Sequence, residues 1–494
     1  MRYISTRNSS GEGVTSAFAI KNGLASDGGL YMPESIPTLS LSDIEGLCRL
    51  SYNERCARIL STFLDDYTYE ELLEDANEAY SIKKFGENPT PITKLDEKTL
   101  MLELWHGPTA AFKDMALQIM PRLFVRALKK CGEDRTALIL VATSGDTGKA
   151  ALEGYKDVDG TKIKVFYPTD GVSAVQKMQM RSQEGGNVSV NGIVGNFDDA
   201  QSGVKKIFSD SAIKETLNAS GVFLSSANSI NWGRLVPQIV YYVSAYCDLV
   251  NMGEIRLGDK VDACVPTGNF GNIFACYIAK KMGVPYEKLV CASNRNNVLT
   301  DFLESGTYDK NREFYKTTSP SMDILISSNL ERLLYLTVGS EKCAKYMKKL
   351  SAEGKYTIDS ADLKSIRESF VGFYADEENV KDIIGYTYKN KNCLVDTHTA
   401  VALYCADRYT TTLKAERKIV AVSTASPYKF ASDVLTALTS TPSEDEFASL
   451  TELEKLTGVQ IPLPLQNIVQ RPVLHKAVIE RDGMERATLE FAKA

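Results

Sequence analysis

Hydrophobic and polar residues follow two different rhythms along the chain. Apolar residues recur at helical spacing in residues 44–60 and 69–80, so the first 87 residues are predicted to form a small helical module. From residue 88 onward, short apolar or β-branched runs alternate with helical patterns. This alternation is typical of parallel βαβ units, in which helices cover both faces of a sheet. We therefore expect an α/β protein.

Six of these apolar runs are each followed by a helical pattern. Strands are expected at residues 136–142, 162–167, 188–194, 260–265, 289–292 and 417–423. The helices after them are expected to begin at or near residues 147, 173, 198, 271, 298 and 427. In sheets of this kind, ligands bind where strands run into helix N-termini. The loops between these elements are therefore the candidate functional loops.

Two further stretches complete the organisation. Residues 307–391 are more helical and more charged, with helical segments predicted at 331–336, 341–350 and 361–373. The tail after residue 441 contains four prolines and is predicted to be an extended arm that ends in a short helix. The predicted domains are therefore the helical module 1–87, the αβ domains 88–260 and 261–441, and the C-terminal arm 442–494.

The composition narrows the class of protein. The chain has 494 residues, of which 44% are hydrophobic and 24% charged, as in an ordinary folded globular protein. Lys and Arg total 57 against 63 Asp and Glu, a formal net charge of −6, so nucleic-acid binding is not expected. The polar first residues lack the pattern of a signal peptide, and no apolar run approaches the roughly 20 residues that span a membrane. We expect a cytoplasmic protein that does not enter the membrane.

Cysteine and histidine usage argues against metal chemistry. The ten cysteines are scattered singly with no C-x-x-C pair, and most lie among apolar neighbours, so we interpret them as buried thiols. The three histidines are far apart in the sequence. No metal site is expected.

The loop at residues 266–272 follows a predicted strand and opens a predicted helix. Its two glycines allow the backbone to turn inward, so that successive N–H groups and the helix dipole can meet a phosphate. An ordinary βα turn with glycines at its bends is an equal alternative. The candidate phosphate ligands are Gly268, Asn269, Phe270, Gly271 and Asn272.

A second loop, residues 142–148, also joins a predicted strand to a predicted helix. It places hydroxyl groups and backbone donors where a carboxylate could bind. A nucleotide P-loop is excluded, because only two residues separate its glycines and an alanine follows its lysine. The candidate carboxylate ligands are Thr143, Ser144, Gly145, Asp146 and Thr147.

Two other segments carry candidate residues. Lys113 follows a Gly-Pro turn and two alanines and stands next to Phe112. A lysine in apolar surroundings loses proton affinity and becomes a nucleophilic amine suited to a Schiff base, although a solvated helix lysine is the simpler interpretation. Residues 422–430 run from a predicted strand into a helix, and their hydroxyl groups, that of Thr424 included, could cap this helix or reach a heterocyclic nitrogen.

Taken together, these motifs resemble the threonine synthase family, which belongs to the pyridoxal-phosphate enzymes of fold type II. The resemblance extends over nearly the whole chain in the family's order, and it is to the long form with an Asp-Gly-Gly-Leu N-terminal module. The matching segments are residues 3–7, 23–31, 106–114, 143–148, 228–231 with Arg234, 266–272, 319–323 and 423–427.

The resemblance implies two open, mostly parallel sheets with helices on both faces, as in the β subunit of tryptophan synthase, and pyridoxal 5′-phosphate as the cofactor. It implies that Lys113 forms the Schiff base, that residues 268–272 bind the cofactor phosphate, and that Thr424 contacts the pyridine nitrogen. Residues 143–147 would then bind the substrate carboxylate.

The chain departs from the family pattern at two positions. Ser426 stands where histidine is frequent. Asp146 stands where relatives with Ser-Gly-Asn place an asparagine on the phenolic oxygen of the cofactor. The partner of that oxygen is therefore open.

The implied reaction converts O-phospho-L-homoserine and water to L-threonine and phosphate, the last step of threonine biosynthesis, with Lys113 as the catalytic base. The leaving phosphate requires cations or aligned donors. The candidates are the cations Lys149, Lys177, Arg181 and Arg234 and the neutral donors Ser173 and Asn231.

Other activities of the same fold remain open. The alternatives are a serine or threonine dehydratase, a phospholyase that releases a keto acid, and a catalytically silent scaffold. In each catalytic case the partner is a small-molecule substrate, and we expect a monomer or a dimer.

Overall fold

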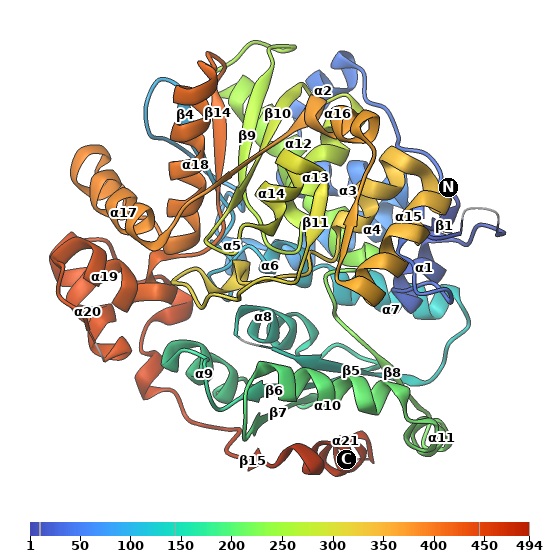
Figure 1. Ribbon diagram of the computed structural model, residues 1–494. Helices are drawn as coiled ribbons and strands as arrows, with labels where there is room; N and C mark the ends of the chain where they lie inside the picture. The colour runs from blue at the N-terminus through green and yellow to red at the C-terminus, as the bar shows by residue number, and fades with distance from the viewer. Residues whose placement is uncertain (9–10, 144, 444, 494) are drawn as a thin grey trace.

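The computed structural model describes residues 1–8, 11–143, 145–443 and 445–493. Its two larger sheets lie one above the other in Figure 1, with α6 (Asp114–Leu117) and α8 (Asp146–Tyr155) between them. The upper sheet has the strand order β13-β10-β9-β14-β4-β3 and the lower one β15-β7-β6-β5-β8. Every pair of neighbouring strands is parallel except β3 with β4. The expected α/β class with two mostly parallel sheets is confirmed.

The five-stranded sheet follows the predicted alternation closely. Helices α8 and α9 (Ala174–Arg181) cover its face toward the upper sheet, and α10 (Phe197–Ser209) and α11 (Ser211–Ala219) lie on the other side (Figure 1). Its strands are β5 (Thr136–Ala142), β6 (Thr161–Pro168), β7 (Val188–Ile193), β8 (Val222–Ser225) and β15 (Val478–Ile479).

The six-stranded sheet draws strands from both sides of residue 260. Two strands precede Lys113 in the sequence, and the other four follow residue 260. Its strands are β3 (Ile92–Lys94), β4 (Thr99–Glu103), β9 (Val261–Pro266), β10 (Tyr286–Ser293), β13 (Phe370–Tyr374) and β14 (Ile419–Ser423). The helices that pack on it include α13 (Gly271–Met282), α14 (Val298–Ser305) and α18 (Thr397–Leu413), and α17 (Glu377–Lys391) packs on α18.

The prediction of a helix over residues 361–373 is wrong at its C-terminal end. Helix α16 (Ser360–Ser369) ends at Ser369. The residues after it form β13 (Phe370–Tyr374), which pairs in parallel with β10. Pairing at the sheet edge decides the outcome, because the aromatic and β-branched residues of β13 fit a pleated, half-buried surface. Gly372 allows the close approach, since a Cβ there would lie 2.8 Å from the Cα of Thr300.

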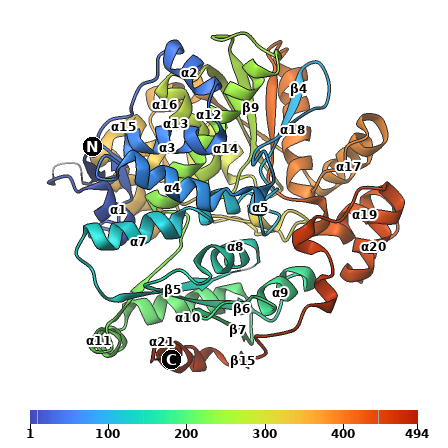
Figure 2. The same cartoon turned by 180° about the vertical axis from the view of Figure 1, so that it is seen from behind.

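The N-terminal segment forms helices that pack on the long buried helix α12 (Trp232–Asn251). Figure 2 shows α2, α3 and α4 on this side of the molecule. The periodic stretch 44–60 is divided between two helices, because the Ser51 hydroxyl accepts a hydrogen bond from the Glu54 N–H and starts α3. The elements are β1 (Tyr3–Ser5), α1 (Ser16–Asn22), β2 (Tyr31–Pro33), α2 (Leu41–Cys48), α3 (Tyr52–Phe63), α4 (Tyr69–Ala79), α5 (Ile82–Phe85) and α7 (Met120–Lys130).

The segment after α14 is largely helical, as predicted. Helix α15 (Leu330–Glu353) contains both predicted segments, 331–336 and 341–350, and is broken between them at Gly339, whose φ is 77° and ψ is 173°. Strands β11 (Thr307–Asp309) and β12 (Lys355–Thr357) form a small antiparallel pair beside it.

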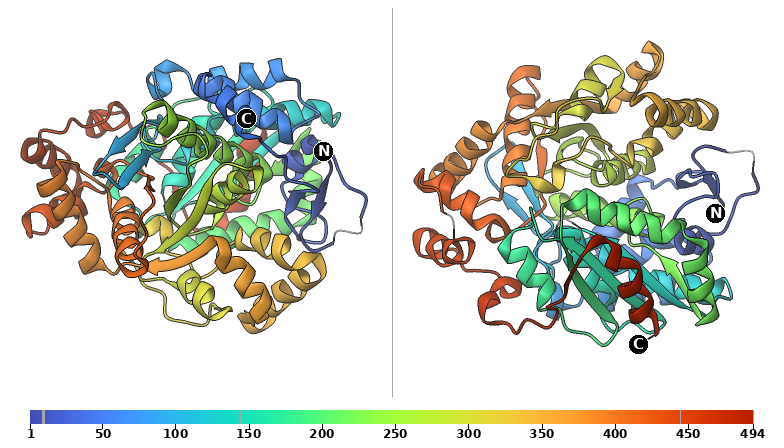
Figure 3. Two further views of the ribbon diagram at one scale, coloured as in Figure 1. Left: turned by 90° about the horizontal axis from the view of Figure 1, so that it is seen from above. Right: turned by 60° about the horizontal axis from the view of Figure 1, so that its bottom comes forward.

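The C-terminal segment crosses from the upper sheet to the lower one. It begins with α19 (Ala431–Thr439) and α20 (Glu446–Thr457), a helix that was predicted as extended arm. Asp445 starts α20 by accepting hydrogen bonds from the N–H groups of Phe447 and Ala448. The chain then adds β15 to the lower sheet, and α21 (Met484–Lys493) packs across the outer face of that sheet (Figure 3).

Candidate active site

Lys113 lies beside Thr424 because two distant segments pair with each other. The N–H of Leu104 donates to the carbonyl of Ser423 over 2.9 Å, and the N–H of Phe112 donates to the carbonyl of Thr424 over 2.8 Å. The first bond continues the parallel pairing of β4 with β14, and the second lies beside an isolated antiparallel bridge between Ala111 and Ala425. The two predicted cofactor residues are thus held together by backbone, at the carboxyl ends of parallel strands.

The Lys113 amine is buried and close to two polar side chains. Its side chain is 11% exposed, and Nζ lies 3.6 Å from Oδ2 of Asp146. Nζ also lies 3.3 Å from the hydroxyl of Ser321. Burial lowers the pKa of Lys113, and the charge of Asp146 opposes this shift in part. The amine therefore gives up its proton more easily than an exposed lysine.

The loop 268–272 forms a turn at the start of α13. Phe270 adopts the left-handed region at φ 61°, and the helix begins at the next residue. A Cβ on Gly268 would lie 3.0 Å from the carbonyl oxygen of Ser321, so the loop is packed against the segment that contacts Lys113. Asn272 accepts hydrogen bonds from the hydroxyls of Tyr241 and Tyr242, while its buried Nδ2 has no partner among the described residues.

The loop after β5 is shaped by Thr143. Its hydroxyl accepts hydrogen bonds from the N–H groups of Gly145 (3.0 Å) and Gly148 (2.9 Å), which fixes the entry into α8. Gly145 has a φ of 149°, and a Cβ there would overlap the side chain of Gln176. Thr147 is half-buried in the first turn of α8. Ser144 lies outside the described residues.

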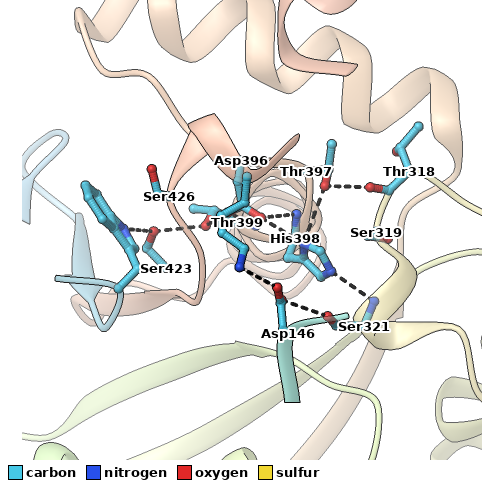
Figure 4. A network of polar contacts seen from close by, with 12 residues as sticks. Asp146, Thr318, Ser319, Ser321, Asp396, Thr397, His398, Thr399, Ser423 and Ser426 are labelled. Atoms are coloured by element: carbon cyan, nitrogen blue, oxygen red, sulfur yellow. Dashed lines mark hydrogen bonds and ion pairs between the residues drawn. The ribbon is translucent and has the colours of Figure 1, made fainter. Parts of the chain in front are cut away.

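Asp146 points into the protein toward two lysines. Its Oδ1 lies 2.8 Å from Nζ of Lys429 and accepts a hydrogen bond from Gln176 over 2.8 Å. Its Oδ2 faces Lys113 and Ser321, and Figure 4 shows Asp146 turned toward Ser321. Burial alone would raise the pKa of Asp146, but the charges of Lys429 and Lys113 hold it well below its usual range. The carboxylate is therefore ionised.

Arg234 is a buried cation with no carboxylate partner among the residues that the structure describes. Its side chain is 5% exposed, and its Nη1 donates to the carbonyl of Ala227 over 2.8 Å. Its Nε has no partner among the described residues. Burial lowers the pKa of the guanidinium to about 10. Its charge is one of the causes that lower the pKa of Lys113.

Asn329 joins the Arg234 segment to the loop 268–272. Its Nδ2 lies 3.3 Å from the carbonyl of Ser229 and 3.1 Å from the carbonyl of Asn269. The starts of α12 and α13 are therefore tied together. Two helix N-termini that converge in this way favour negatively charged groups.

The other predicted ligands of the substrate phosphate have protein partners. Asn231 caps α12 and donates to the carbonyl of Ile20, and Ser173 caps α9. Lys149 forms an ion pair with Glu153, with N and O 3.0 Å apart. Lys177 and Arg181 donate to the backbone carbonyls of Thr169 and His475, respectively. Among the predicted cations, Arg234 is the one whose burial and free Nε fit a bound anion.

Four residues of this network carried no predicted role. Ser321 and Lys429 lie in motifs that the sequence analysis singled out, but only tertiary contacts reveal what they touch. Asp396 and His398 gave no sequence signal. Nδ1 of His398 is 2.8 Å from Asp396, and its Nε2 accepts a hydrogen bond from the N–H of Ser321 over 3.2 Å (Figure 4).

The described part of the chain offers neither a metal site nor a membrane-spanning helix. No group of three or more His, Cys, Asp or Glu side chains there is arranged to hold a metal ion. None of the described helices combines the length and the apolar character needed to cross a membrane.

Comparison with known sequence families gives three matches. Residues 2–80 match the family described as threonine synthase N terminus. Residues 83–425 match the pyridoxal-phosphate dependent enzyme family. Residues 399–461 match the family described as threonine synthase, C-terminal.

Individual proteins are similar over most of the chain. Threonine synthase-like 1 of Homo sapiens is 38% identical over 476 residues, which cover 94% of this chain and 62% of that protein. The chain thus spans about three-fifths of the length of that relative. Threonine synthase of Pseudomonas aeruginosa is 37% identical over 439 residues, 87% of this chain and 89% of the relative. The crystal structure of pyridoxal-phosphate-bound threonine synthase from Brucella melitensis superimposes with a TM-score of 0.88 at 35% identity, over 100% of both chains.

Proposed function

Because the chain belongs to the threonine synthase family of pyridoxal-phosphate-dependent enzymes, we propose that it converts O-phospho-L-homoserine and water to L-threonine and phosphate. The observation that carries this proposal is the buried guanidinium of Arg234, whose Nε has no partner among the described residues, at the start of α12, which Asn329 ties to the loop 268–272. A buried cation is costly unless an anion neutralises it. A substrate phosphate would supply that anion, whereas serine has no anionic group besides its α-carboxylate, which the loop after β5 would bind.

The residues present fit the pyridoxal phosphate that this family uses. Lys113 would carry the cofactor, and Thr424 would face its ring nitrogen. The start of α13 would bind the phosphate, since a glycine loop, a helix N-terminus and the unpartnered Nδ2 of Asn272 meet there. When bound, the cofactor supplies an electron sink that makes the proton on the substrate Cα removable.

The substrate would be oriented from its two charged ends. The loop between Thr143 and α8 offers backbone N–H groups and a helix N-terminus for the α-carboxylate. Arg234, at the start of α12, would bind the phosphate ester. A guanidinium suits this task because its planar donors match phosphate oxygens. The reacting carbons then lie between these ends, next to Lys113.

Lys113 would move the protons. A buried amine with a lowered pKa is a suitable base near neutral pH. Since the amine holds one extra proton at a time, it would take the proton from Cα and release it before it takes the one from Cβ as phosphate leaves Cγ. It would then deliver a proton to Cγ, so that water can add at Cβ, and return a proton to Cα last. Thr424 is a neutral hydroxyl and does not force a proton onto the ring nitrogen, which favours elimination and replacement over transamination.

The experiment that tests this function measures both products separately. Purified protein loaded with pyridoxal phosphate is incubated with O-phospho-L-homoserine, and threonine and phosphate are quantified. Equal amounts of the two support the proposal. Phosphate with a keto acid and ammonium would identify a phospholyase, and neither product would identify a catalytically silent relative. Lys113→Ala is the control for cofactor chemistry that does not need this lysine.

A further inference from the structure

Lys429 is a buried lysine whose position the proposed reaction does not yet explain. It lies in the short helical turn Pro427–Phe430, five residues after Thr424, and its side chain is 0% exposed. Its ammonium group donates to Gln179 Oε1 over 2.9 Å and to the carbonyl of Thr109 over 3.1 Å, and it lies 2.8 Å from Oδ1 of Asp146. All three ammonium hydrogens are thus used by protein groups, so Lys429 has no donor left for a substrate.

Asp146 lies between Lys429 and Lys113. One carboxylate oxygen, Oδ1, binds Lys429, and the other, Oδ2, is 3.6 Å from Nζ of Lys113. Asp146 belongs to the lower sheet region, whereas both lysines belong to segments next to the upper sheet.

A carboxylate that paired with Lys113 alone would oppose the loss of a proton that the proposed reaction requires of this lysine. A buried Asp–Lys pair holds its proton, because removing it leaves an uncompensated negative charge in a medium of low dielectric. With Lys429 present, Asp146 keeps a cationic partner when Lys113 becomes neutral. The total charge of the three groups is then zero.

We propose that Lys429 is a positioning residue that neutralises Asp146, so that Lys113 can lose its proton although an aspartate stands beside it. The inference rests on the role proposed for Lys113. It goes further because it identifies Lys429 as the cation that compensates the charge of Asp146.

Lys113, Asp146 and Lys429 form a triad, and the other charged groups near this triad do not neutralise Asp146 in place of Lys429. His398, from α18, has Nδ1 2.8 Å from Asp396 and accepts the N–H of Ser321 at Nε2, so both of its ring nitrogens are used by groups other than Asp146. Arg234, from α12, acts on Lys113 in the same direction as Lys429 but does not touch Asp146. Asp114, from α6, is bonded to the N–H and hydroxyl of Thr109.

The test uses cofactor-loaded protein and measures the pH midpoint of the cofactor's absorption change. This midpoint reports loss of the proton from Nζ of the lysine to which the cofactor is bound. Lys429→Met should raise this midpoint by about 1 to 3 pH units, the range for an opposite charge a few ångströms away. Asp146→Asn should lower it, because Lys429 then repels a proton on Lys113. The double variant should return close to wild type. A purely structural role would not give shifts of opposite sign.

Lys149→Met is the matched control, since Lys149 is also buried and paired with a carboxylate, Glu153, but lies outside the triad. Its midpoint should equal that of the wild type. Borohydride reduction and peptide mapping of the wild type show separately which lysine carries the cofactor. Label on Lys113 with both single variants within about 0.3 pH units of wild type overturns the charge role of Lys429 alone. Label elsewhere overturns the assignment of Lys113 and the inference with it.

Discussion

Replacing Arg234 by methionine should make the protein more stable and less active. The change removes a guanidinium that is 5% exposed and that, within the described part of the chain, has a carbonyl but no carboxylate as partner. Burial lowers its pKa to about 10, against an ordinary value of about 12.5. The charged form is therefore disfavoured in the folded protein by roughly 3 kcal/mol, and this cost is fully present at any pH below 10.

The stability gain follows from this cost. Losing the hydrogen bond to Ala227 subtracts about 1 kcal/mol, so Arg234→Met should raise the unfolding free energy of the substrate-free protein by about 2 kcal/mol. Urea unfolding at pH 7.5 measures it. Arg55→Met is the matched control, because Arg55 is equally buried but ion-paired with Asp248 at 2.6 Å. That variant should be less stable than wild type, since it leaves Asp248 without its cation.

The activity should change in the opposite direction. Truncating one partner of a buried charge pair costs about 2 to 5 kcal/mol, so kcat/KM for O-phospho-L-homoserine should fall between about 30-fold and several thousand-fold. In Arg55→Met it should stay near the wild-type value. A loss below about threefold in Arg234→Met, or a drop in its stability, would refute the assignment of Arg234 to the substrate phosphate.

Three further outcomes are expected. Lys113→Ala should fold and lose turnover by at least roughly 10² to 10⁴, and borohydride should no longer label the segment around residue 113. Gly268→Ala should weaken cofactor binding in an absorbance titration and lower the unfolding free energy by about 1 to 3 kcal/mol, because the new Cβ has no room, whereas Gly46→Ala, with open space around it, should not destabilise. Burial raises the pKa of Asp114 to about 7, so its contribution to stability is present at low pH and is lost as pH rises to 7. The stability advantage of Asp114→Asn over wild type should therefore grow between pH 4.5 and 7.5 in urea unfolding.

The alternating strands and helices could be predicted because each element follows from the apolar pattern of its own residues. The strand of residues 136–142 has the bounds that its apolar pattern predicts, and the helix of residues 271–282 begins at the residue that its pattern predicts. The edge strand Phe370–Tyr374 was missed, since pairing with a strand some 80 residues earlier overrides the helical periodicity of its own segment. Local pattern predicts an element well where local and tertiary preferences agree.

In the candidate site, too, features set by local sequence could be predicted, and contacts between distant residues could not. Its loops follow strands and precede helices, so their place at the carboxyl ends of the sheets could be predicted from Gly145, Gly268 and their neighbours. The partnership of Asp146 with Lys429 could not, because it joins residues 283 positions apart by an ion pair. Nor does the sequence distinguish Arg234 from Lys149, since only the packed structure shows which cation already has a carboxylate.

The return of the C-terminal helix to the lower sheet has a consequence for how the protein is made. Met484 and Ala492 complete the apolar layer that Leu138 and Leu140 begin, and Lys162 donates to the last carbonyls of α21. On the ribosome, β5 to β8 emerge first, and their outer layer is completed on the order of 270 residues later. At typical elongation rates this delay is roughly 15 to 50 s. During that interval the nascent chain exposes apolar surface that chaperones bind. This half of the enzyme is therefore protected from aggregation only when the finished polypeptide is released, and not when translation of the sheet itself is complete.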